Sequence, residues 1–232
     1  MRLLYTILEW MMRFFVVNLL WIMFNIPVVY LIISLLLAEK QSQFISLTII
    51  LVVISPFLLF PATAGMFGVI RKWIMNEREI PVVQSFWKFY KENYVKSMFG
   101  GFIIEVLWII FIVDYYYFIT YVSEMFIYLF IILFILLFMF TVYFISTIIH
   151  FEAKLLYSLK NAMLITLGRP IFSFGLGIMN ALIIYVSVYQ ITFLIPTFMG
   201  TLITLVSFSG FYKVYVTLEK SREKDAMKGY IE

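Results

Sequence analysis

Residues 55–73 read SPFLLFPATAGMFGVIRKW, an uncharged, apolar segment that ends in a basic and aromatic loop. Six of the 17 Lys and Arg residues lie between this segment and the next apolar one: Arg71, Lys72, Arg78, Lys88, Lys91 and Lys96. The cytoplasmic loops of membrane proteins carry an excess of such cations. The pattern therefore predicts a membrane-spanning helix whose C-terminal end meets the cytoplasm, and it orients the rest of the chain.

The composition indicates an integral membrane protein. Of the 232 residues, 64% are hydrophobic and 13% are charged, and the mean hydropathy is +1.04. A soluble fold of this length could not bury so much apolar surface. We expect residues 1–232 to form one all-α domain, a polytopic membrane helical bundle. The net charge of +4 does not indicate a nucleic-acid partner, because the cations lie at the ends of apolar segments, where they contact membrane lipid.

Six segments are long enough to form transmembrane helices, which need roughly 20 apolar residues each. They cover approximately residues 14–38, 44–70, 97–118, 125–149, 171–190 and 196–216. With both termini cytoplasmic, 16 of the 17 cations lie inside and only Lys40 lies outside. The last two spans come from 42 residues without Asp, Glu, Lys or Arg, and we expect a turn near residues 190–196.

The N-terminal residues 2–13 allow two interpretations. Arg2, Thr6, Glu9 and Arg13 recur at helical spacing among apolar residues, which is typical of an amphipathic helix on the inner membrane surface. The same residues could instead begin the first span. Both interpretations keep the N-terminus cytoplasmic, and the absence of a small-residue cleavage site predicts a retained span rather than a signal peptide.

The second span holds two prolines and a patch of small residues. Pro56 and Pro61 each remove a backbone donor, which predicts a kink. Ala64 and Gly68 are four residues apart, a spacing that lets two helices approach closely. Close packing is the first interpretation of this patch. The alternative is an unwound half-helix that contacts a transported substrate.

The loop after the second span predicts an interfacial surface. Arg71, Lys72 and Trp73 open it, and residues 82–96 place further rings among cations, including Phe86, Trp87, Lys88 and Lys91. Rings and cations at headgroup level favour a helix that lies in the membrane interface. The two candidate roles for this surface are lipid anchoring and the docking of a cytoplasmic partner.

Glu105 is the candidate functional residue inside the membrane. It lies about eight residues from the inner end of the third span, where an ionised carboxylate costs a few kcal/mol unless it is paired. We expect Glu105 to face the bundle interior. It could be a proton or cation site, or it could clamp a polar neighbour by a hydrogen bond, with Asn18, Asn25 and Asn180 as the candidates.

The sequence contains no recognisable catalytic or metal-binding motif. It has no phosphate-binding glycine loop, nucleophile elbow or dinucleotide fingerprint. The single histidine, His150, ends a span beside charged residues and has no cysteine or second histidine with which to hold a metal, so we interpret it as a solvated cap. We expect a protein that is not an enzyme and carries no cofactor.

The chain resembles the YesL family of bacterial membrane proteins. The resemblance rests on five stretches: NLLW at 18–21, NIP at 25–27, PATAGMF at 61–67 running into RKW at 71–73, the aromatic loop at 86–96, and SLKNA at 158–162. It implies a multi-pass protein of the bacterial inner membrane, of unassigned molecular function and often encoded beside oligosaccharide importers. The family supplies no established catalytic residues.

The loop from Glu152 and Ala153 to Pro170 is similar in outline to the Glu-Ala-Ala loop by which importer permeases dock their ATPase. It departs from that pattern at Lys154 and lacks the expected glycine six residues after Glu152. The first functional hypothesis is an accessory or regulatory component of carbohydrate uptake that contacts subunits of an ABC-type importer. The second is a small secondary transporter that uses Glu105. The sequence leaves the solute and the oligomeric state open.

Overall fold

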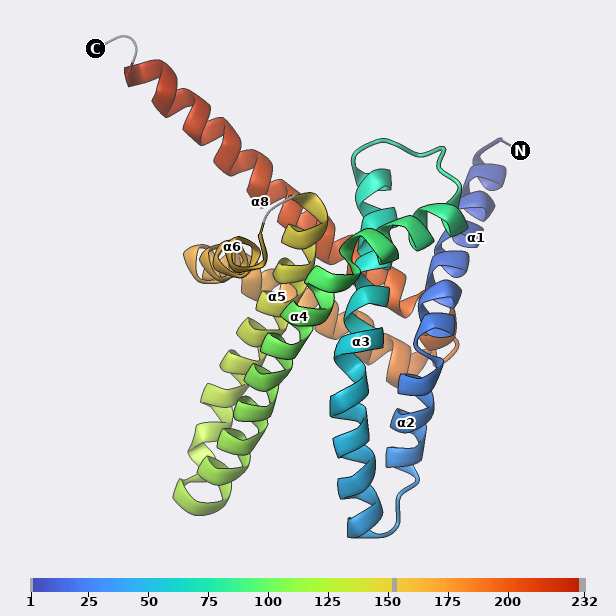
Figure 1. The fold of residues 1–232 in the computed structure, drawn as a ribbon. Coiled ribbons are helices and arrows are strands. Elements are labelled where there is room, and N and C mark those ends of the chain that lie inside the picture. The colour runs from blue at the N-terminus through green and yellow to red at the C-terminus, as the bar shows by residue number, and fades with distance from the viewer. Residues whose placement is uncertain (1, 152–153, 230–232) are drawn as a thin grey trace.

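The computed structural model describes residues 2–151 and 154–229, with side chains for residues 4–151 and 154–220. Every regular element among these residues is helical (Figure 1). The elements are α1 (Arg2–Phe24), α2 (Ile26–Leu36), α3 (Gln41–Ile74), α4 (Val82–Tyr117), η1 (Phe118–Val122), η2 (Glu124–Phe126), α5 (Ile127–His150), α6 (Leu155–Gly168), α7 (Pro170–Tyr185), η3 (Val186–Gln190), η4 (Ile195–Met199) and α8 (Gly200–Gly229).

Six helical stretches of the described chain are long and apolar enough to cross a membrane. They are Leu4–Phe24, Gln41–Ile74, Val82–Val122, Glu124–His150, Pro170–Gln190 and Ile195–Lys220. The predicted all-α bundle with six candidate spans is confirmed. The N- and C-terminal ends and the loop between α3 and α4 lie at one end of the molecule (Figure 1), which we call the terminal end.

The first predicted span, residues 14–38, is divided at Asn25. Asn25 has φ −106° and ψ 14°, which ends α1, and α2 then begins with Pro27 in its first turn. Proline suits that position because the first helical N–H groups have no partner within the helix. Residues 2–13 are continuous with the rest of α1. They therefore begin the first long helix and do not form a separate interfacial one.

Helix α3 runs without interruption through Pro56 and Pro61. The unwound half-helix considered as an alternative is therefore absent, and most of residues 55–73 are buried. The core includes Phe67 and Ile70 of α3 and is completed from the other helices by Val17, Phe86, Ile104, Tyr143, Phe144, Phe208 and Phe211.

Helix α4 is a single element where the sequence predicted an interfacial helix at 82–96 followed by a span at 97–118. Its first part passes across α3, and its second part descends beside α5 (Figure 1). Two glycines bring it close to both neighbours. A Cβ on Gly101 would lie 2.6 Å from the Phe60 ring of α3, and one on Gly100 would meet the Phe144 ring of α5.

The hairpins α2–α3 and α4–α5 meet at the terminal end and diverge toward the opposite end (Figure 1). Their diverging parts carry exposed apolar side chains, among them Val53, Val106 and Leu129. In a bilayer such side chains face acyl chains without cost. The last part of α8 extends away from the bundle at the terminal end.

Candidate functional site

Glu105 lies on α4 and bonds to α3. Its carboxylate accepts a short hydrogen bond from the hydroxyl of Ser55 on α3. One turn away, Phe57 and Phe102 pack edge to face with their centroids 5.3 Å apart. Ser55 is buried and Glu105 is partly buried. The pair is a polar link between the hairpins α2–α3 and α4–α5.

The partner of Glu105 is therefore a serine on the adjacent helix and none of the three predicted asparagines. Each asparagine is buried and bonded elsewhere. Asn25 donates to the Trp21 carbonyl at 2.8 Å, within its own helix end. Asn180 on α7 exchanges hydrogen bonds with Ser207 on α8 at 3.0 and 3.3 Å. Among the described residues, none of the three asparagines forms a hydrogen bond with Glu105.

Asn18 joins the first helix to the start of the last one. Its amide nitrogen donates to the carbonyl of Pro196 at 2.8 Å, and its oxygen accepts from the backbone N–H of Thr201 at 3.3 Å. Thr201 in turn donates its hydroxyl to the Phe14 carbonyl at 3.0 Å. Asn18 therefore bonds to the backbone of both η4 and the first turn of α8.

The small-residue patch of α3 receives aromatic rings from α4. A Cβ on Gly68 would lie 2.3 Å from Cγ of Phe89, and one on Gly65 would lie 3.2 Å from the Phe86 carbonyl. Ala64 is fully buried beside them. Close packing, the first interpretation of this patch, describes the geometry: the Phe89 ring fills the notch at Gly68, and both the backbone carbonyl and the ring of Phe86 approach Gly65.

Two residues predicted for the interfacial surface are part of the core. Trp73 stacks on Phe14 at 5.7 Å and meets Trp10 edge to face at 5.4 Å. Phe86 is fully buried and packs against Phe24 with centroids 5.3 Å apart. The prediction was wrong for both residues because charge and ring content locate a loop but do not say which way each ring points.

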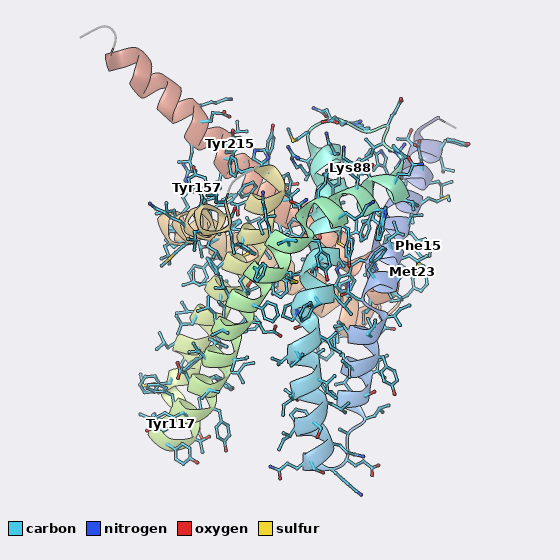
Figure 2. All side chains as sticks on the ribbon, in the orientation of Figure 1. Phe15, Met23, Lys88, Tyr117, Tyr157 and Tyr215 are labelled. Atoms are coloured by element: carbon cyan, nitrogen blue, oxygen red, sulfur yellow. The ribbon has the colours of Figure 1, made fainter. Side chains whose placement is uncertain are left out.

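Three further predicted residues form an outward surface on the first part of α4, which we call the α4 outer face: Trp87, Lys88 and Lys91. The Lys91 ammonium lies 5.1 Å from the Trp87 ring centroid, a cation–π distance. Lys88 is exposed at the terminal end (Figure 2) and lies 3.9 Å from Glu92. The helix is fixed from behind by buried Phe86 and Phe89, so these three side chains are held on a rigid support.

The two cations at the end of α3, Lys72 and Arg71, differ in their contacts. Lys72 forms an ion pair with Glu77 at 2.7 Å. Arg71 has a buried Nε atom that finds no hydrogen-bond partner among the described residues, and the same holds for Nδ1 of His150. His150 is surrounded by rings, with Tyr215 at 4.6 Å and Phe151 at 4.8 Å between centroids. The interpretation of His150 as a solvated cap is therefore wrong.

The predicted docking loop is described only in part. Glu152 and Ala153 lie outside the described residues, whereas Pro170 is exposed and begins α7. Between them α6 forms an additional short helix that the sequence analysis did not identify. Among the described residues, no group of three or more His, Asp or Glu side chains could hold a metal ion.

Comparisons with known proteins give one family match and several similar bacterial proteins. Residues 14–115 match the family described as "Protein of unknown function, DUF624". Over 216 residues the chain is 23% identical to the uncharacterized protein YesL of Bacillus subtilis, covering 93% of this chain and 91% of YesL. The chain is therefore similar to YesL over most of the length of both proteins. This confirms the resemblance that the sequence motifs indicated.

Two further Bacillus subtilis proteins are similar. The uncharacterized protein YteU is 23% identical over 96% of this chain and 90% of its own length, and the uncharacterized protein YesV is 25% identical over 66% of this chain and 76% of its own. No solved structure matches the chain significantly. The family match spans α1 to α4, so it contains the Ser55–Glu105 link and the α4 outer face.

Proposed function

We propose that the protein is a non-catalytic accessory or regulatory component of carbohydrate uptake by an ABC-type importer in the bacterial inner membrane, with both termini in the cytoplasm. The α4 outer face carries the proposal. It presents one tryptophan and two lysines from a helix anchored on its opposite side by Phe86 and Phe89. Aromatic anchors on rigid supports are characteristic of protein docking surfaces. The YesL resemblance supplies the importer as the expected partner.

The use of the membrane-embedded polar groups also supports a scaffold. Glu105 bonds to Ser55, Asn18 to the start of α8, and Asn180 to Ser207. Each of these contacts joins two helices. Polar side chains that form hydrogen bonds between helices stabilise one arrangement of the bundle.

The test is co-purification of the full-length chain from a bacterial host in mild detergent. We expect mass spectrometry to identify importer permease or ATPase subunits with the parent protein. Reversing the charge on the α4 outer face with Lys88→Glu and Lys91→Glu should remove them. A matched double variant, Lys213→Glu and Lys220→Glu, changes two exposed lysines of α8 and should retain them. Absence of importer subunits from the parent preparation, or their retention by the outer-face variant, would show the proposal to be wrong.

A secondary transporter is the second candidate. The observation that favours it is the position of Glu105, a partly buried carboxyl group within a candidate membrane span. Reconstitution of the chain alone in liposomes decides between the candidates. The accessory role predicts no proton-coupled solute flux. Flux by the parent that Glu105→Gln abolishes would establish transport, because an amide cannot carry the proton.

A further inference from the structure

Two depressions meet at the corner between α6 and α7. The first is a cavity of about 640 Å³ between α6 and α8. Its walls are aromatic and carry a few polar groups: Phe151, Tyr157, Asn161, Phe211, Tyr215 and Glu219. The second is a trough of about 590 Å³ along the start of α7, lined by Ile171, Phe172, Leu176 and Met179. Gly168 and Arg169 line both, so a partly polar chamber is joined to an apolar trough.

The chamber contains one charge of each sign. Within the part of the chain that the structure describes, the Arg169 side chain forms no hydrogen bond or ion pair. Glu219 accepts a hydrogen bond from the Tyr215 hydroxyl at 3.0 Å through one oxygen, which leaves its other oxygen available. Tyr157 and Tyr215 come from neighbouring α6 and α8 on this side of the molecule (Figure 2). A ligand with a phosphate and an ammonium group would satisfy both charges.

The glycines of this corner leave space that no residue fills. Surroundings are described for nine glycines, and a Cβ on seven of them would meet another side chain or the backbone within 4 Å. Gly168 and Gly175 meet nothing within that distance, and both line the trough. Glycine inside a helix is unfavourable unless something approaches the backbone closely. Gly175 lies inside α7, so a helix end does not account for it.

We propose that this corner binds one zwitterionic aminophospholipid of the phosphatidylethanolamine type. Arg169 holds the phosphate, and Glu219 with the Tyr157 and Tyr215 rings holds the ammonium group. One acyl chain runs along the trough over Gly175. The trough follows α7 from its first residue, and Ile171 and Met179 are exposed along it, as a surface that faces an acyl chain would be. The site does not include the α4 outer face and does not depend on the importer.

The test measures lipid binding to the purified, delipidated full-length chain by native mass spectrometry. We expect one phosphatidylethanolamine to bind about tenfold more tightly than phosphatidylglycerol, whose headgroup lacks the ammonium group that Glu219 holds. Arg169→Gln and Glu219→Gln should each weaken phosphatidylethanolamine binding by about tenfold. Lys160→Gln is the matched control: it removes an exposed cation of α6 that does not line the chamber, and binding should stay at the parent level.

Two further measurements separate the headgroup from the tail and from folding. Gly175→Leu fills the trough without a clash at its Cβ and should weaken lipid binding, while glycerophosphoethanolamine, the headgroup without tails, should not bind measurably. All variants should unfold at the parent temperature in lipid-free detergent. Equal binding of the two phospholipids, or phosphatidylethanolamine binding unchanged by Arg169→Gln, overturns the proposal. Tight binding of glycerophosphoethanolamine would overturn the role assigned to the trough.

Discussion

At the residue scale, the hydroxyl of Ser55 explains how a carboxyl group is accommodated between two apolar hairpins. A polar group in hydrocarbon is costly unless it has a partner. Glu105 finds that partner on α3, the helix against which α4 packs. The hydrogen bond therefore stabilises both the side chain and the crossing of α3 with α4.

Removing the Ser55 hydroxyl should destabilise the bundle. Ser55→Ala leaves the Glu105 carboxyl group without its donor, and we expect the free energy of unfolding to fall by about 0.5–2 kcal/mol. Thermal unfolding in mild detergent measures the effect. Ser46→Ala is the control, because Ser46 also lies on α3 but is exposed and bonds only to the Ser42 carbonyl of its own helix. Equal stability of the two variants would contradict a structural role for the link.

Gly68 is the second residue whose identity the packing requires. A side chain there would overlap the Phe89 ring, because a Cβ would lie 2.3 Å from its Cγ. Gly68→Leu should lower the free energy of unfolding by about 1–3 kcal/mol through overpacking. Gly175→Ala, measured in the same lipid-free detergent, introduces a Cβ into open space and should unfold at or above the parent temperature. A stable Gly68→Leu protein would show that α3 and α4 can separate at this point.

At the element scale, single polar contacts join helices for which the hydrophobic effect gives little driving force to associate inside a membrane. Lipid tails are as apolar as leucine, so packing and hydrogen bonds determine which helices meet. Asn18 joins α1 to the start of α8, and Asn180 joins α7 to α8. The last hairpin is thus held at two levels by two asparagines.

The Asn180–Ser207 pair offers a direct measurement of this effect. Both groups are buried, and each donates to the other. A double-mutant cycle of Asn180→Leu and Ser207→Ala should give a coupling energy of about 0.6–1.7 kcal/mol, the range for hydrogen bonds between membrane helices. Thermal or denaturant unfolding of the four proteins supplies the values. Strictly additive effects would mean that the two side chains do not interact in the folded protein.

At the scale of the whole molecule, the largest group of cations in one loop region lies at the end of the bundle where the termini lie. The ends of the chain and the loop between α3 and α4 share one end of the bundle (Figure 1), and that loop together with the first part of α4 carries six of the 17 Lys and Arg residues. This arrangement agrees with an even number of crossings. Because cytoplasmic loops carry an excess of Lys and Arg, the cations at the terminal end predict that this end faces the cytoplasm.

Cysteine labelling tests that orientation. The chain has no cysteine, so single-cysteine variants give clean signals. Cysteines at the exposed positions Lys40 and Ser123 should react with an impermeant thiol reagent in intact cells, and a cysteine at the exposed position Glu79 should react only after permeabilisation. Labelling of the Glu79 variant in intact cells would reverse the proposed topology.

The sequence alone determined the class of the protein and the number of long apolar helices. These follow from composition and segment length, because roughly 20 apolar residues have few options other than a membrane helix. The polar positions within the spans could also be read from the sequence. Their roles could not, since a buried serine such as Ser55 gives no signal that marks it as the partner of a residue 50 positions away.

Only the tertiary structure decided how those helices are turned toward one another. Trp73 and Phe86 point into the core while Trp87 points outward, and nothing in their spacing distinguishes them because rings suit both environments. The partner of Glu105 and the corner between α6 and α7 likewise depend on where helices cross. Crossing is set by the fit of many side chains at once, as in the notch at Gly68 that receives Phe89, and the pattern along a single helix does not contain that information.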